Sequence, residues 1–150
     1  MTPDVNVLVA ASRSDHPHHP HHPVARAWLV QAVAACANGA VLTLMPVVVA
    51  GFLRLLTSAR VFKLPTPMDQ AVDFIDALLR TPGVWLAPLG AERPVLRQLC
   101  LAGPLSGNDV PDAWLAAATL HGGEHLVAFD RDFKRWLGRS PLTLLAPLAA

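Results

Sequence analysis

Charged residues are scarce in this chain of 150 residues. They make up 15% of the sequence, against about 25% in a typical soluble domain, whereas hydrophobic residues make up 53%. This composition excludes intrinsic disorder and implies a large buried core within a single domain spanning residues 1–150. Lys and Arg exceed Asp and Glu by a net charge of only +1, so a surface that binds nucleic acid must be local.

Cysteine is also scarce. Cys36 and Cys100 lie far apart and form no Cys-x-x-Cys pattern, which excludes a zinc finger and a thiol redox motif. We expect both thiols to be buried in a reduced, cytoplasmic protein.

A long uncharged stretch runs between Arg26 and Arg54, and its length would allow it to span a bilayer. However, the turn signal Asn38-Gly39 stands in its middle and Pro46 follows. Each remaining segment is shorter than the ~18 residues that a spanning helix needs. We therefore expect two buried elements, no membrane segment and, because no basic residue precedes Arg13, no secretion signal.

Short apolar runs alternate with amphipathic stretches along the chain. The periodicity predicts helices over 23–36, 46–56, 67–79, 92–101, 111–121 and 131–137, and strands over 41–44, 83–86, 126–129 and 142–145. This alternation is typical of an α/β fold with a central parallel β-sheet flanked by helices on both faces. The first eleven residues fit either a strand or a strand that ends at Asp4 before a helix. We expect Trp28, Trp85 and Trp114 in the core.

Carboxylates follow several of these elements. Asp4 follows the first apolar residues, Asp130 and Asp132 follow the strand 126–129, and Asp109 and Asp112 begin a helix. Sites in open α/β sheets form at the carboxyl ends of the strands. Carboxylates that converge there need a cation to offset their repulsion, and oxygen ligands favour Mg²⁺ or Mn²⁺. The alternative is that these residues are helix caps and turn formers.

Three segments together resemble the PIN-domain family. They are Asp4-Val5-Asn6-Val7-Leu8, NDVPDAWLAAATLHGG (Asn108–Gly123) and HLVAFDRDFKRW (His125–Trp136). Their order and spacing are similar to those of VapC-type toxin ribonucleases from bacterial toxin–antitoxin pairs, and the resemblance covers essentially the whole chain.

The resemblance implies a PIN-like domain with an acidic pocket for Mg²⁺ or Mn²⁺, in which the first strand ends at Asp4 and a helix follows. Asp4, Asp112 and Asp130 would be metal ligands, with Asp132 nearby and Asn6 as a supporting side chain. It also implies endoribonuclease activity on structured RNA such as tRNA or ribosomal RNA, a small antitoxin that covers the pocket, and a homodimer.

One position departs from the family pattern. Gly51 stands where the family places a glutamate on the helix VVVAGFLRLL, and glycine supplies no ligand. Three explanations are compatible with the sequence. Gly51 is an introduced inactivating change, or the protein is a degenerate PIN-like module that binds antitoxin or RNA without cutting well, or Asp109 takes the glutamate's place.

Basic residues flank the expected pocket. Arg131 and Lys134 follow Asp130, and Arg54 follows Gly51. We expect these three residues to contact RNA phosphates, the alternative being a solvated helix face.

The histidine tract from His16 to His22 is interrupted by prolines. Such a tract can bind metal, and a metal-sequestering protein is therefore a further alternative, although the resemblance implies a loop here.

Overall fold

The computed structural model describes residues 1–15 and 19–147. The strands within these ranges are β1 (Thr2–Pro3), β2 (Leu42–Leu44), β3 (Val84–Leu86), β4 (Leu126–Ala128) and β5 (Leu142–Leu144). The α-helices are α1 (Val5–Ser12), α2 (His22–Cys36), α3 (Pro46–Leu56), α4 (Met68–Leu79), α5 (Arg93–Ala102), α6 (Asp109–Gly122) and α7 (Lys134–Leu137). Two short 3₁₀ helices, η1 (His19–His21) and η2 (Arg131–Phe133), precede α2 and α7.

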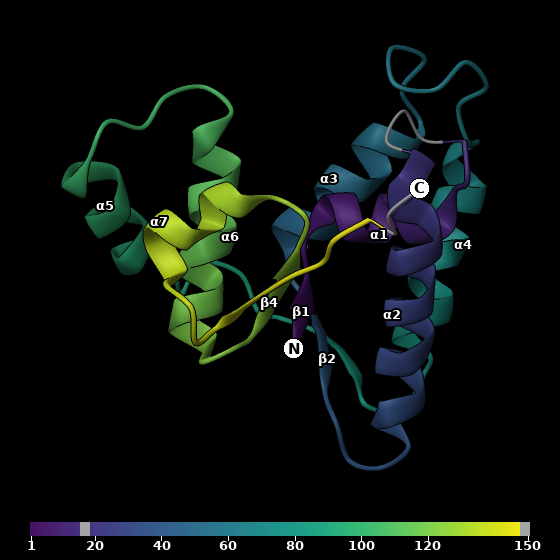
Figure 1. Cartoon of the computed structure of the whole chain (residues 1–150), viewed down its shortest axis with the longest axis horizontal. Coiled ribbons are helices and arrows are strands. Elements are labelled where there is room, and N and C mark those ends of the chain that lie inside the picture. Colours follow the sequence, from purple (N-terminus) through teal and green to yellow (C-terminus); the bar gives the residue numbers. More distant parts are fainter. Residues whose placement is uncertain (16–18, 148–150) are drawn as a thin grey trace.

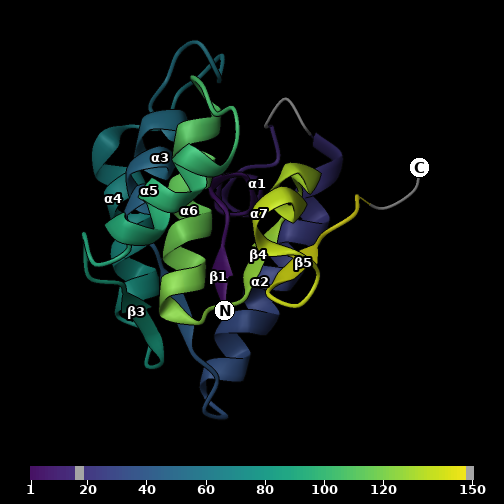
Figure 2. The ribbon, with the colours of Figure 1, turned by 90° about the vertical axis from the view of Figure 1, so that its left-hand side faces the viewer.

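The strands form a parallel arrangement, as predicted. β1 pairs with β4, β4 pairs with β5, and β2 pairs with β3, each in parallel. The two groups meet where the backbone N–H of Thr43 donates to the carbonyl oxygen of Met1 at 2.9 Å, which gives the order β3-β2-β1-β4-β5. Helices α1 to α4 lie on one side of the strands, and α5, α6 and α7 lie on the other (Figures 1 and 2). The predicted α/β fold with helices on both faces is therefore confirmed.

Prolines and glycines set several helix limits. Pro23, Pro46 and Pro94 stand in the first turns of α2, α3 and α5, where the missing N–H costs nothing. Gly123 ends α6 in the left-handed conformation with φ of 61°. At the start of the chain, β1 stops at Pro3 and Asp4 caps α1.

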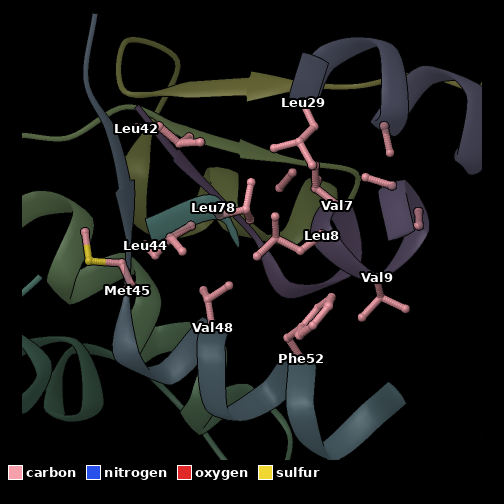
Figure 3. Packing of buried hydrophobic residues seen from close by; sticks show 14 of the residues in the cluster. Val7, Leu8, Val9, Leu29, Leu42, Leu44, Met45, Val48, Phe52 and Leu78 are labelled. Carbon is pink, nitrogen blue, oxygen red and sulfur yellow. The ribbon is translucent and has the colours of Figure 1, made fainter. Parts of the chain in front are cut away.

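Most of the core lies between the sheet and helices α1 to α4 (Figure 3), and α6 and α7 add Leu115, Ala116 and Leu137. Helix α1 is buried along most of its length and contributes Val7, Leu8 and Val9. Phe52 of α3 packs among them and is fully buried. Because α1 is held inside the molecule, the residues at its start have fixed positions.

Three expectations about burial are wrong. Trp85 is 64% exposed because it lies on the edge strand β3, where alternate side chains point to opposite faces. Trp114 is 38% exposed on α6, and its indole Nε1 donates to Glu92 Oε1 at 2.6 Å. Cys100 is partly exposed, as α5 contains no buried residue, whereas Cys36 is buried. Trp28 packs against the core but is only partly buried.

Within the described part of the chain, none of the helices has both the length and the apolar character needed to cross a bilayer.

We expect the Gly83→Ala substitution to lower the free energy of unfolding by about 1–3 kcal/mol more than Gly90→Ala. Both glycines have positive φ, +85° and +94°, so alanine is strained at both. A Cβ atom at Gly83 would lie 2.8 Å from Cys36 Cβ, whereas no heavy atom lies within 4 Å at Gly90. Denaturant unfolding of both variants measures the difference, and equal losses would contradict the close packing of β3 against α2.

Candidate active site

A cavity of about 340 Å³ lies beside the carboxyl end of β1. Residues of α1, α3 and α6 form its walls: Asp4, Val5, Asn6, Val47, Val48, Gly51, Arg54, Leu55, Asn108, Pro111, Asp112 and Leu115. Five of the predicted site residues, Asp4, Asn6, Gly51, Arg54 and Asp112, therefore share one cavity. Asn108, Pro111 and Val5 also line it, and no sequence signal had singled them out.

Asp4 is a buried carboxylate at the junction of β1 and α1. Its side chain is 2% exposed, and its oxygens accept hydrogen bonds from the backbone N–H groups of Val5 at 2.6 Å and Asn6 at 3.4 Å. Burial raises the pKa of Asp4 to about 7, the capping N–H of Val5 opposes this rise, and the nearby charges of Asp112 and Asp130 add to it. The protein thus holds a carboxyl group where its ionised form is costly.

Asp112 lies in the first turn of α6 and faces the same cavity. Its pKa is raised to about 6, first by burial and next by the charge of Asp130, while Arg135 opposes the rise. Asp109 and Asp132 contribute smaller repulsions. The two carboxyl groups that line the cavity are therefore both poised close to neutral pH.

Asp130 follows β4, next to β1 in the sheet. Its Oδ1 accepts a hydrogen bond from the backbone N–H of Asp132 at 2.7 Å, and it caps η2. Asp130 lines a smaller hollow of about 210 Å³ together with Asn6, His21 and Phe129. Since Asn6 also lines the larger cavity, it connects the two hollows. Asp132 is exposed on η2.

The oxygen atoms around the cavity are of the kind that bind a hard divalent cation. They are carboxylate and amide oxygens, which Mg²⁺ and Mn²⁺ prefer, and the mutual repulsion of Asp4, Asp112 and Asp130 is what a cation would relieve. Across residues 1–15 and 19–147, however, no three His, Cys, Asp or Glu side chains are grouped closely enough to hold a metal ion. Asp4 and Asp130 both direct carboxylate oxygens to backbone N–H groups as helix caps.

Gly51 lies on α3 where this helix approaches α1. A Cβ atom at Gly51 would lie 3.0 Å from Val5 Cγ2 and 3.6 Å from Val5 Cβ. The position that the family pattern assigns to glutamate therefore faces the cavity, but the methyl group of Val5 crowds it.

Asp109 is engaged elsewhere. Its Oδ1 accepts a hydrogen bond from Arg135 Nη2 at 2.7 Å, and this guanidinium lowers the pKa of Asp109. Asp109 is not among the residues that line the cavity. This geometry argues against the explanation in which Asp109 replaces the family glutamate.

The three basic residues that were predicted to contact RNA line two different hollows. Arg54 is exposed and lines the acidic cavity. Arg131 and Lys134 are exposed beside a separate hollow of about 430 Å³, which His21 and Phe129 also line. His21 and Phe129 had not been predicted as functional residues, because their proximity depends on the tertiary fold. Of the histidine tract, His16 and His18 lie outside the described residues, and the Nδ1 atom of His22 lies 2.6 Å from the carbonyl oxygen of Ala10.

A second feature of the surface is a group of exposed apolar side chains. Two hollows of about 360 Å³ each lie against α6 and the segment that precedes α5; one is also lined by the start of α3 and the other by β3. We define the apolar face by residues that line them: Trp85, Leu86, Pro88, Leu89, Trp114 and Ala118. Glu92 is buried between the two hollows. Burial opposes its ionisation, but hydrogen bonds, first that of Trp114, lower the pKa of Glu92 overall.

Comparisons with known proteins place the chain among characterised relatives. It is 38% identical over 134 residues to Ribonuclease VapC25 of Mycobacterium tuberculosis, covering 89% of this chain and 90% of that protein. It is 38% identical over 136 residues to Ribonuclease VapC31 of the same species, with the same coverage. A match of 37% identity to its Ribonuclease VapC43 covers 89% and 87% of the two chains. No family model matches the sequence.

One solved structure supports the fold. The crystal structure of VapBC2 from Rickettsia felis bound to a DNA fragment from their promoter matches with a TM-score of 0.62, covering 96% of each chain. Only 17% of the aligned residues are identical, so this likeness concerns the fold alone.

We expect the metal-free protein to lose stability from about pH 4 to pH 7, and the Asp4→Asn variant to lose much less. The folded state keeps a proton on Asp4 up to about pH 7, whereas the unfolded chain releases it near 3.8. Because the folded state binds more protons in this window, its free energy of unfolding falls as the pH rises. Asparagine still caps α1 but carries no charge, so the variant should be more stable than the parent at about pH 8, by about 2–4 kcal/mol.

Denaturant unfolding with a chelator present at about pH 4, 6 and 8 measures this effect. Asp73→Asn, which changes an exposed carboxylate on α4, is the matched control. Parallel pH curves for the parent, Asp4→Asn and Asp73→Asn would contradict the burial argument.

Proposed function

The chain belongs to the VapC ribonuclease family, and from this premise we propose that it is the endoribonuclease toxin of a toxin–antitoxin pair. It would cleave structured RNA such as tRNA or ribosomal RNA in the cytoplasm, with Mg²⁺ or Mn²⁺ as cofactor. The observation that carries the proposal is the convergence of Asp4, Asn6 and Asp112 on one cavity, with Asp130 in the adjoining hollow.

Asp4, Asp112 and Asp130 would hold the cation, with Asp132 nearby. A bound divalent cation supplies an activated water for phosphodiester hydrolysis and neutralises charge on the phosphate. The raised pKa values of Asp4 and Asp112 support this role, because they mark carboxylates that are costly to ionise without a compensating charge. To face a common ion, Asp4 and Asp130 would have to share their oxygens between capping and coordination.

The other residues of the cavity would orient the substrate. Asn6 can donate from its side-chain amide at the junction of the two hollows. Arg54 can bind a phosphate of the RNA at the rim of the cavity. Arg131 and Lys134 would contact phosphates beyond Asp130.

A second candidate function is a PIN-like module that binds antitoxin or RNA without efficient cleavage. Gly51 favours it, because the cavity lacks a carboxylate there and a Cβ atom at this position would already lie in tight contact with Val5. Cleavage by the parent chain distinguishes the two functions.

We also propose a small antitoxin protein as partner. The acidic cavity would accept a basic side chain of that partner, since the same repulsion that favours a cation favours a guanidinium or ammonium group. Antitoxin binding would be measured by adding the antitoxin to a variant of this chain that cleaves RNA and recording the loss of cleavage.

The apolar face supports a homodimer. Trp85, Leu86 and Leu89 are 64%, 51% and 74% exposed, and exposed apolar groups gathered in this way are typical of protein interfaces. Helix α5 follows Leu89, and none of its residues is buried within the described part of the chain. A second copy packed against it would therefore also bury apolar side chains of α5.

We expect restoring a carboxylate at position 51 to raise Mn²⁺-dependent cleavage of a total tRNA pool by at least about tenfold, since removing one catalytic group commonly costs this much. The Gly51→Glu variant tests the carboxylate, and the double variant Val5→Ala/Gly51→Glu tests it without the crowding methyl group. Gly51→Ala is the matched control that introduces the Cβ alone. Asp4→Asn and Asp112→Asn, made in the most active variant, should abolish cleavage without unfolding the chain.

Retained cleavage by a folded Asp4→Asn chain would overturn the site assignment. Equal cleavage by parent and Gly51→Glu would mean that the remaining carboxylates suffice. The absence of cleavage in every variant would favour the binding module.

We expect Leu89→Asp to convert the proposed dimer to a monomer, because it places a charge within the apolar face. Leu64→Asp is the matched control: Leu64 is 76% exposed, against 74% for Leu89, but lies outside the face. Sedimentation velocity at micromolar concentration measures the masses. A parent chain that sediments as a monomer, or a Leu89→Asp chain that stays dimeric, would contradict this interface.

A further inference from the structure

We propose that the stacked rings of His21 and Phe129, together with Arg131 and Lys134, form a subsite that holds an unpaired nucleotide of the RNA beside the acidic cavity. The proposal rests on the proposed ribonuclease function and adds to it the part of the substrate that is recognised, an unstacked base next to the cleaved phosphate.

The ring pair is a defined feature of the fold. His21 ends η1, and Phe129 follows β4 directly. Their ring centroids are 3.9 Å apart with an interplanar angle of 9°, so the rings are parallel and stacked. Both residues are only partly buried, which leaves ring surface within reach of a ligand.

The ring pair is continuous with the proposed catalytic residues. Asn6 and Asp130 line the same hollow of about 210 Å³ as the two rings, and Asn6 lines the acidic cavity as well. On the other side, the rings line the hollow of about 430 Å³ with Arg131 and Lys134. A strand of RNA that passes from the acidic cavity over Asn6 therefore meets two aromatic rings first and two cations next.

The chemistry of these groups fits a nucleotide. An unpaired base stacks on aromatic side chains whatever its sequence, and Arg and Lys bind the phosphates on either side of it. Because Arg131 directly follows Asp130 in the chain, a phosphate bound there lies close to the acidic residues. Double-stranded RNA presents no free base face, so the subsite would select loops and ends within structured RNA.

The test measures binding of a fluorescently labelled single-stranded RNA of about eight nucleotides by anisotropy, with the parent chain and with single variants. Phe129→Leu keeps an apolar side chain but removes the ring, and should weaken binding by about tenfold without changing the salt dependence. Phe129→Trp keeps a ring and should bind like the parent. Lys134→Ala should instead reduce the slope of log affinity against log salt by about one unit.

Two controls separate stacking from a merely structural role. Leu64→Ala shortens an apolar side chain that is 76% exposed and lies outside both the apolar face and the proposed subsite, and it should leave binding unchanged. A second RNA that carries abasic sites should bind the parent and Phe129→Leu equally, because it has no base to stack. Thermal unfolding of each variant shows that its fold is intact.

Equal binding of the intact RNA by parent and folded Phe129→Leu would overturn the subsite alone. A loss of the same size with the abasic RNA would also overturn it, since the ring would then act only by holding the loop in place. If Phe129→Leu bound RNA normally but no longer bound the antitoxin, the ring pair would belong to the protein interface instead. If the parent bound no RNA and none of its position-51 variants cut any, the proposed ribonuclease function itself would fail.

Discussion

The burial of one carboxylate, that of Asp4, is the constraint on which the candidate site depends. The backbone N–H of Asp4 donates to the carbonyl oxygen of Val127 on β4 at 2.8 Å, and its side chain caps α1. One residue thus ends the pairing of β1 with β4, starts the most buried helix and places an ionisable group in the interior. Asparagine would cap the helix equally well without the cost of burying a charge. The fold alone therefore does not explain an ionisable group here, whereas the proposed cation site would.

The close approach of α1 and α3 limits what the cavity can contain. Gly51 allows this approach, and a Cβ atom at position 51 would require the Val5 side chain to shift by a few tenths of an ångström. The departure from the family pattern at Gly51 therefore also involves the side chain at position 5, which packs against it. A glutamate placed opposite Val5 must displace it or adopt a different path, so the missing ligand and the packing of the two helices are linked.

Much of the fold could be predicted because its limits are set locally. The bounds of α3 match the predicted range 46–56, since Pro46 fixes its start, and α6 extends only one residue beyond its predicted end at 121 because Gly123 stops it. The exposure of Trp85 and Trp114 could not be predicted from the sequence, because an apolar residue is buried only where the fold supplies a partner for it. The strand pattern placed Asp130 at the end of a strand, and the family resemblance did so for Asp4, but only the pairing of β1 with β4 makes them neighbours. The stacking of His21 on Phe129 likewise joins distant segments, and no local pattern encodes it.

Helices α3 and α6 connect the acidic cavity to the apolar face. On α6, Asp112 and Leu115 face the cavity, whereas Trp114 and Ala118 face the apolar hollow, as the helical spacings of three and four residues require. On α3, Val47 lines both the acidic cavity and an apolar hollow. Gly51 lines the acidic cavity and Ala50 lines the apolar hollow. A partner packed on the apolar face would restrain the same two helices that carry Asp112, Gly51 and Arg54. Because densely packed interiors compress little and transmit strain, a partner bound at the apolar face would also affect the geometry of these carboxylates.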